Sequence, residues 1–218
     1  MFGRNSKVDL ALNRDVEKLI ATGGKDRILP IVQAGEPVLR QVTVPYAGQL
    51  SKHTLSKLIE TMRSTMIEAP GVGLAATQIG LGLSIAVLED HMREEDEGDS
   101  REMAELPFRV IINPSYEPVG EQTTSFYEGC LSFDGYQAVR RRWLDIIAEW
   151  DDENGERHKE RMHGWPARIF QHETDHLSGE LYIDKAEIRS LTTYENLEDF
   201  WCDDPVPTLA ASELGFDL

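Results

Sequence analysis

Two histidines and a glutamate lie close together in the last third of the chain, at His172, Glu173 and His176. In a helix, residues four apart share a face, so both imidazole rings can direct a nitrogen to one metal ion. The glutamate beside them can take and return the proton of a water molecule. A purely structural helix would leave this carboxylate buried without a partner, which is costly. The pattern therefore predicts a metal-dependent hydrolase.

The flanking residues predict the helix that this spacing requires. Pro166 suits the first turn of a helix, and Gly179 suits a left-handed turn just beyond its end. Ile169 falls one turn before the first histidine, on the same face. We therefore expect a short helix that presents the two histidines and the glutamate on one face.

A catalytic metal site needs a third protein ligand, and the sequence offers two. Downstream, Glu195 lies in a Glu-x-x-x-Asp pattern, as in zinc endopeptidases of the thermolysin type. Upstream, Cys130 lies in the stretch 128–132, directly after a strand-like run, and a thiolate is a good ligand for zinc or ferrous iron. These residues alone are compatible with two functions, a zinc endopeptidase and a hydrolase with a cysteine ligand.

The remaining pattern predicts an α+β fold. A helix is expected over residues 51–68, where apolar residues repeat at helical spacing and Pro70-Gly71 follows. Short strands and hairpins surround the late helix rather than alternating with helices, which favours antiparallel or mixed sheets packed around it. The expected strands are 83–88, 109–113, 123–127, 143–150 and 156–162.

Composition limits the class of protein. The 218 residues are enough for one domain, and the formal net charge of −17 argues against binding to nucleic acid or to an anionic membrane. The presence of only two cysteines fits a reducing compartment, and no apolar run has the length of a membrane span, so we expect a cytoplasmic protein. We expect an N-terminal extension at 1–27, an exposed acidic insertion at about 90–105 and an acidic tail at 186–218.

The segment 71–80 is rich in small residues and leads into an expected strand. It lacks the Lys-Ser/Thr pair of a phosphate-binding loop, and no helix is expected to begin there. Glycines let a backbone approach a ligand closely, so we interpret the segment as part of a substrate-binding surface.

Three segments together resemble a known family. The sequences GVGLAATQ at 71–78, EGCLS at 128–132 and QHETDHL at 171–177 resemble, in order and spacing, the three signature motifs of peptide deformylase. The likeness extends to the flank at 33–40 and covers residues 28–185. It implies a metallohydrolase that removes the N-terminal formyl group from formyl-methionyl nascent polypeptides and releases formate.

The resemblance also implies a role for individual residues. Glu173 would be the general base and then the general acid, and the side-chain amide of Gln78 and the backbone N–H of Leu131 would form an oxyanion hole. Gly73 would line the peptide groove through its backbone, and Val72 and Ile169 would line the methionine pocket. The implied metal ligands are Cys130, His172 and His176.

The resemblance implies one divalent metal ion, with Fe²⁺ expected and Zn, Ni or Co also compatible with these ligands. The expected partners are N-formylmethionyl peptides and nascent chains near the ribosome, with no direct binding to nucleic acid or membrane. An inactive, metal-stabilised binding protein with the same fold is a further hypothesis.

The sequence departs from the family pattern at several positions. Gln137 stands where Arg or Tyr is common near the substrate backbone, and Arg168 stands where many bacterial members have an apolar pocket residue. The sequence therefore does not determine the shape of the pocket. An ion pair between Glu128 and Arg142 is expected to support the site.

Overall fold

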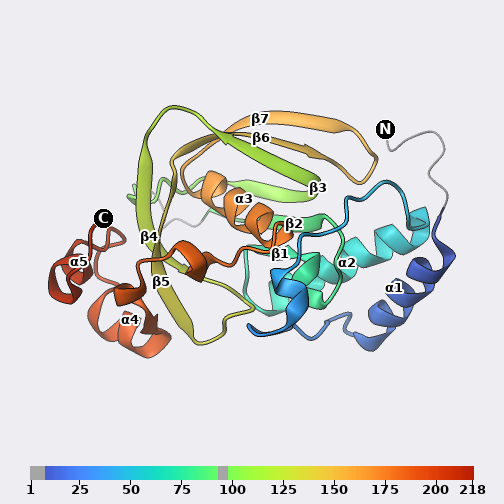
Figure 1. Ribbon diagram of the computed structural model, residues 1–218, viewed down its shortest axis with the longest axis horizontal. Coiled ribbons are helices and arrows are strands. Elements are labelled where there is room, and N and C mark those ends of the chain that lie inside the picture. The colour runs from blue at the N-terminus through green and yellow to red at the C-terminus, as the bar shows by residue number, and fades with distance from the viewer. Residues whose placement is uncertain (1–7, 93–97) are drawn as a thin grey trace.

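The helix α3 (Gly164–Leu177) packs against two antiparallel β-sheets in the computed structural model, which describes residues 8–92 and 98–218 (Figure 1). The larger sheet has the strand order β1-β2-β3-β6-β7, and the smaller one has the order β4-β5-β8. The prediction of an α+β fold with antiparallel sheets is therefore confirmed. The first sheet consists of β1 (Gly73–Ala75), β2 (Ile85–Asp90), β3 (Leu106–Pro118), β6 (Asp145–Asp151) and β7 (Arg157–His163). The second consists of β4 (Thr123–Gly129), β5 (Tyr136–Trp143) and β8 (Thr192–Thr193).

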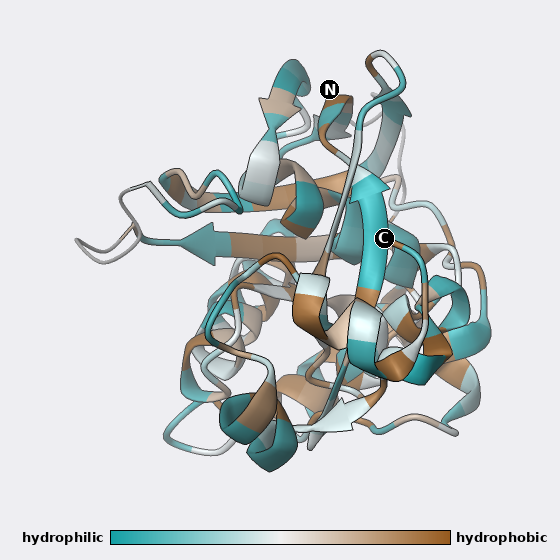
Figure 2. Ribbon diagram, turned by 90° about the vertical axis from the view of Figure 1, so that its left-hand side faces the viewer, coloured by the Kyte–Doolittle hydropathy of each residue, from teal (hydrophilic) through white to brown (hydrophobic). Residues whose placement is uncertain are grey.

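The helix expected at 51–68 is present as α2 (Lys52–Glu68). Ser51 caps it by accepting a hydrogen bond from the Thr54 backbone N–H at 3.1 Å. Its apolar face includes Leu58, Met62 and Met66, which are fully buried and pack against β1 and β2. Figure 2 shows hydrophobic and hydrophilic residues within the same helices, as expected for helices with one buried face.

Part of the N-terminal extension forms a helix on the core. α1 (Leu10–Thr22) is capped by Asp9 and packs on α2, where it buries Val16. The side chain of Asn13 accepts a hydrogen bond from the Ser51 N–H at 2.8 Å, and that of Glu17 accepts one from Thr54 Oγ1 at 3.0 Å. These contacts tie the extension to the start of α2. Residues 1–7 of the extension lie outside the described residues.

α3 begins two residues before Pro166 and ends before Gly179, which has a left-handed φ of 82°. A side chain at Gly179 would meet the backbone of Arg40 at 2.8 Å, so both the backbone conformation and the close approach favour glycine. Phe170 is fully buried in the core between α3 and the larger sheet. The helix is thus fixed on several sides and can hold its polar residues rigidly.

Two expectations differ from the structure in detail. A short 3₁₀ helix at Ala76–Ile79 follows β1 in the segment where no helix was expected. The run Tyr136–Trp143 was not predicted as a strand, yet it forms β5 and buries Arg140 and Arg142. The tail carries two further helices, α4 (Tyr194–Phe200) and α5 (Thr208–Leu214), within the described residues.

The acidic insertion is anchored where the structure describes it. The Trp165 indole N–H donates to Asp90 Oδ2 at 3.0 Å, and the Trp165 backbone N–H donates to the Glu102 carbonyl at 3.3 Å. Both ends of the insertion are therefore attached to the start of α3, although most of its described residues are exposed, as expected. Residues 93–97, which carry much of the predicted acidic run, lie outside the described residues. Among the helices that the structure describes, none is long and apolar enough to cross a membrane.

A buried carboxylate links α2 to the larger sheet. Glu89 in β2 accepts a hydrogen bond from Arg63 Nε at 2.6 Å, and Arg63 also lies over the Phe108 ring, 4.5 Å from its centroid. The hydrogen bond from Arg63 lowers the pKa of Glu89 despite the opposing effect of burial. The ionised form of Glu89 therefore stabilises the folded state.

We expect Glu89→Gln to lower the free energy of unfolding at pH 7 by about 1 kcal/mol, because a charge-assisted hydrogen bond is lost while half-exposed Arg63 is screened by solvent. The folded-state pKa of Glu89 lies below its unfolded value, so this contribution is present above pH ~4.5 and is lost as the pH falls through the folded-state pKa. Urea unfolding at pH 7 and near pH 3 measures the difference. Glu60→Gln removes an exposed pair with Arg27 and is the matched control. A deficit of equal size at both pH values would contradict the prediction.

Candidate active site

Three potential metal ligands converge between the end of β4 and helix α3. Cys130 directly follows β4, while His172 and His176 lie one turn apart on α3. Their potential ligand atoms lie within 4.8 Å of one another, and Cys130 Sγ lies 3.2 Å from His176 Nε2. Glu195 is exposed on α4 and does not belong to this group. The structure therefore brings together the upstream ligand with the histidine pair, and it disfavours the endopeptidase alternative.

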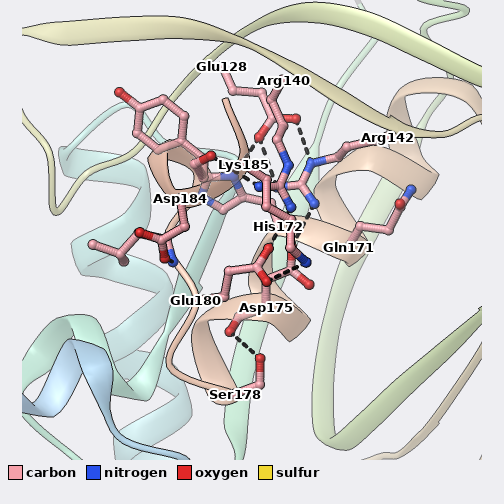
Figure 3. Close-up of polar contacts among 12 residues, drawn as sticks. Glu128, Arg140, Arg142, Gln171, His172, Asp175, Ser178, Glu180, Asp184 and Lys185 are labelled. Carbon is pink, nitrogen blue, oxygen red and sulfur yellow. Dashed lines mark hydrogen bonds and ion pairs between the residues drawn. The ribbon is translucent and has the colours of Figure 1, made fainter. Parts of the chain in front are cut away.

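A buried ionic cluster holds the first histidine in place. The expected pair of Glu128 and Arg142 is present, with Arg142 Nε donating to Glu128 Oε1 at 2.6 Å. Glu128 Oε2 lies 3.1 Å from His172 Nδ1. The other ring nitrogen of His172, Nε2, can therefore serve as the metal ligand together with Cys130. Arg142 also donates to Asp175 Oδ2 at 2.8 Å, and Figure 3 shows Glu128, Arg142, His172 and Asp175 gathered around α3.

Arg168 belongs to the same cluster. Its guanidinium donates to Glu128 and, at 2.9 Å, to the Arg140 carbonyl, and it also lies over the Phe126 ring. Burial alone would raise the pKa of Glu128, but Arg142 and Arg168 hold that pKa well below its usual range. The sequence had left the effect of Arg168 on the pocket open. In the structure this side chain is a buried partner of the carboxylate behind His172.

The electrostatics of the ligand group favour a cation. Burial acts to lower the pKa of His172, but the Cys130 sulfur and the Glu128 carboxylate raise it to about 10. Burial holds the pKa of His176 well below its usual range, so this imidazole is neutral and able to ligate a metal. One thiol and two imidazoles are a donor set that suits Fe, Zn, Ni and Co. The residues present therefore fit a divalent metal ion.

Glu173 lies next to this group and faces Gly73 of β1. It is buried, and its Oε2 atom has no hydrogen-bond partner among the described residues. Burial raises the pKa of Glu173 to about 7. A carboxyl group of this kind can exchange a proton near neutral pH, as a general base and acid must.

Two donors suited to an oxyanion hole lie next to Cys130. Gln78 Oε1 accepts a hydrogen bond from the Ala75 N–H at 2.8 Å, which turns Gln78 Nε2 towards Cys130 Sγ at 3.6 Å. The backbone N–H of Leu131 makes no hydrogen bond to any described part of the chain. Gln78 Nε2 carries a second N–H besides the one directed at Cys130 Sγ, so this group and the Leu131 N–H can both donate to a ligand beside the metal ligands.

A cleft of about 330 Å³ opens onto this group. It is lined by the residues predicted for substrate binding, Val72, Gly73 and Ile169, together with Gln78, Cys130, Leu131, His172 and Glu173. His176 does not line the cleft and is 1 % exposed, so it lies behind the other ligands. Sequence reasoning did not assign four of the lining residues to the cleft. Tyr127 and Trp165 lie next to the predicted site residues in the sequence, whereas Arg101 and Tyr194 come from segments distant from them.

Comparison with known proteins identifies the family of the chain. The family model described as polypeptide deformylase matches residues 28–191. The chain belongs to the peptide deformylase family. Enzymes of this family remove N-formyl groups from nascent peptides by metal-dependent hydrolysis. The resemblance seen in the three sequence motifs is therefore confirmed.

Curated relatives in this family match nearly the whole chain. A peptide deformylase from Bifidobacterium adolescentis is 78% identical over 218 residues, which is 100% of both chains. Peptide deformylase 1 from Streptomyces coelicolor is 50% identical over 204 residues, covering 93% of this chain and 92% of that one.

Solved structures of peptide deformylases share the fold. A Met-Ala-Ser-bound enzyme from Acinetobacter baumannii has a TM-score of 0.66 at 28% identity and covers 72% of this chain and 98% of that chain. The enzyme from Thermotoga maritima has a TM-score of 0.61 at 34% identity, covering 72% and 97%.

The close contact between Gly73 and Glu173 gives a prediction for this peptide deformylase. A Cβ atom at Gly73 would lie 2.3 Å from Glu173 Oε1, so Gly73→Ala must displace that carboxylate. We expect the rate of formate release to fall at least about tenfold, because small displacements of a catalytic group cost large factors. Gly82→Ala is the matched control, since its added Cβ would meet nothing within 4 Å. Equal steady-state rates for the two variants would contradict this reading of the contact.

Proposed function

We propose that this chain hydrolyses the formyl group of N-formylmethionyl nascent polypeptides, with Cys130, His172 and His176 holding the metal ion. The observation that carries the proposal is the convergence of these three side chains within 4.8 Å, beside buried Glu173 and at the base of an open cleft. Three protein ligands leave a position for water or substrate, as a catalytic metal site requires.

A divalent ion bound there would supply Lewis acidity towards water and the formyl carbonyl. We propose Fe²⁺ as the ion used in the cell, with Zn, Ni or Co as substitutes that the same ligands accept. Glu128 keeps its hydrogen bond to His172 Nδ1 and so fixes the orientation of this ligand.

The residues around the metal ligands account for the proton and charge movements. Glu173 takes the proton of the attacking water and later delivers it to the departing amine of methionine. Gln78 Nε2 and the Leu131 N–H donate hydrogen bonds to the oxygen of the formyl group as it gains negative charge. Their positions beside Cys130 support these roles.

The cleft walls suit a formylmethionyl chain. Val72 and Ile169 give an apolar surface for the methionine side chain, and Gly73 gives a backbone edge that an extended peptide can approach. We propose residues 28–185 as the catalytic domain, with 1–27 and 186–218 as additions to it. We place the activity in the cytoplasm near the ribosome, and the net charge of −17 favours recognition of the nascent peptide over direct binding to nucleic acid.

Formate release from formyl-Met-Ala-Ser tests the proposal, with protein loaded with Fe²⁺ under anaerobic conditions. We expect the wild type and Glu195→Gln to release formate, and we expect Cys130→Ala to lose both bound metal and activity. Metal content is measured by atomic spectrometry on the same samples. Full metal binding and activity in Cys130→Ala would refute the ligand assignment. Absence of formate from the metal-loaded wild type would favour a protein that only binds metal.

A further inference from the structure

The C-terminal segment supplies one wall of the active-site cleft. Tyr194, the first residue of α4, lines the cleft together with Gly129, Leu131 and Gln137. The family model ends at residue 191, so Tyr194 lies outside the part of the chain that this model matches. Figure 1 shows α4 beside the lower part of β5, close to the smaller sheet.

Backbone contacts fix Tyr194 in this position. Strand β8 pairs with β5, with Gln137 opposite Thr192 and Tyr136 opposite Thr193. The next backbone N–H, that of Tyr194, donates to the Gly135 carbonyl at 3.2 Å. Thr193 then caps α4 by accepting a hydrogen bond from the Asn196 N–H at 3.2 Å. The tyrosine is therefore held by a strand pairing and a helix cap rather than by a loose tail.

The other cleft residues indicate which part of a substrate reaches Tyr194. The metal ligands and Glu173 take the formyl group, and Val72 and Ile169 take the methionine side chain. The lining residues without an assigned role include two groups. Arg101 and Trp165 form the first, and they are already engaged within the protein, with the Arg101 guanidinium over the Trp165 ring and the Trp165 indole N–H donating to Asp90. Gly129, Gln137 and Tyr194, from the smaller sheet and its tail, form the second. Because the first group is paired within the protein, the second group offers the wall along which the chain after methionine leaves the cleft.

The Tyr194 side chain has the surface needed for such a contact. The residue is 44% exposed, although its backbone is fixed. An aromatic ring on a fixed backbone has few rotatable bonds and offers a large contact area at little cost in conformational entropy. We propose that Tyr194 is a specificity-determining residue that favours apolar side chains at the first or second position after the formylmethionine. This inference rests on the proposed function of the same cleft.

The test compares kcat/KM for formyl-Met-Leu-Ser and formyl-Met-Ala-Leu with that for formyl-Met-Ala-Ser. The preference for leucine is the ratio of kcat/KM for a leucine peptide to kcat/KM for formyl-Met-Ala-Ser. We expect Tyr194→Ala to lower this ratio by about fivefold at one of the two positions, because contact with one or two methylene groups of the leucine side chain is lost. Tyr194→Phe should keep the preference, and Tyr194→Trp should increase it. Tyr136→Ala is the matched control, because Tyr136 is 43% exposed on the paired strand and does not line the cleft.

An unchanged preference at both positions in Tyr194→Ala and Tyr194→Trp would overturn the proposal. Thermal unfolding shows whether the alanine variant is folded. If it is not, the preference measured with Tyr194→Trp alone decides the test. Binding of the product peptides Met-Leu-Ser, Met-Ala-Leu and Met-Ala-Ser, followed by calorimetry, gives the same comparison without turnover. If the wild type releases no formate, the proposed function is refuted. The relative binding of Met-Leu-Ser, Met-Ala-Leu and Met-Ala-Ser would still test the role of Tyr194.

Discussion

Replacement of Glu173 by glutamine is expected to lower kcat for formate release by about 10³-fold while metal content stays unchanged. The side chain keeps its size, so the contact with Gly73 and the position of α3 are preserved. The amide cannot accept the proton of the attacking water, and general acid–base catalysis of this kind is worth about 10²–10⁴-fold. Glu173 is not one of the three clustered ligands, so the metal should remain bound.

Steady-state kinetics with formyl-Met-Ala-Ser and metal analysis of the same sample measure both parts of this expectation. Glu195→Gln is the matched control, since Glu195 is exposed on α4. Activity in Glu173→Gln within tenfold of the wild type would show that another group moves the proton. Loss of metal from this variant would instead assign Glu173 to the ligand group.

The local motifs could be predicted from sequence because their chemistry fixes both residue type and spacing. His172, Glu173 and His176 must share a helix face, and the structure places them on α3. Cys130 was one of two possible third ligands, and no spacing rule selected it, because β4 and α3 meet only in the folded chain. The family resemblance made the choice, and the clustering of Cys130 with both histidines agrees with it.

The buried charges were harder to predict. Arg140 and Arg142 lie in a run of three arginines, a composition that normally indicates a solvent-exposed segment. They are 4% exposed because Glu128, Asp175 and Glu180 come from other elements to meet them. Such pairings are long-range, and only the pair of Glu128 with Arg142 was predicted from the sequence. Tyr194 was missed for the same reason, since its place in the cleft depends on the pairing of β8 with β5.

Replacement of Glu128 by glutamine is expected to lower both stability and metal affinity. Glu128 is 5% exposed and interacts with Arg142, Arg168 and His172. The amide would leave two buried guanidinium groups without their shared carboxylate, and breaking a buried ion pair from one side costs about 3–5 kcal/mol. The orientation of His172 would also be lost, which lowers metal affinity by about 10–100-fold.

Urea unfolding of the metal-free protein and competition with a chelator separate these two effects. Glu149→Gln is the matched control, because Glu149 also interacts with two cations, Arg157 and Lys159, but lies at the surface. We expect the control to lose little stability, since exposed ion pairs contribute little. The buried cluster thus has a dual role, because the carboxylate that neutralises Arg142 and Arg168 is the one that orients His172. A variant that lost stability with full metal affinity would show that these roles are independent.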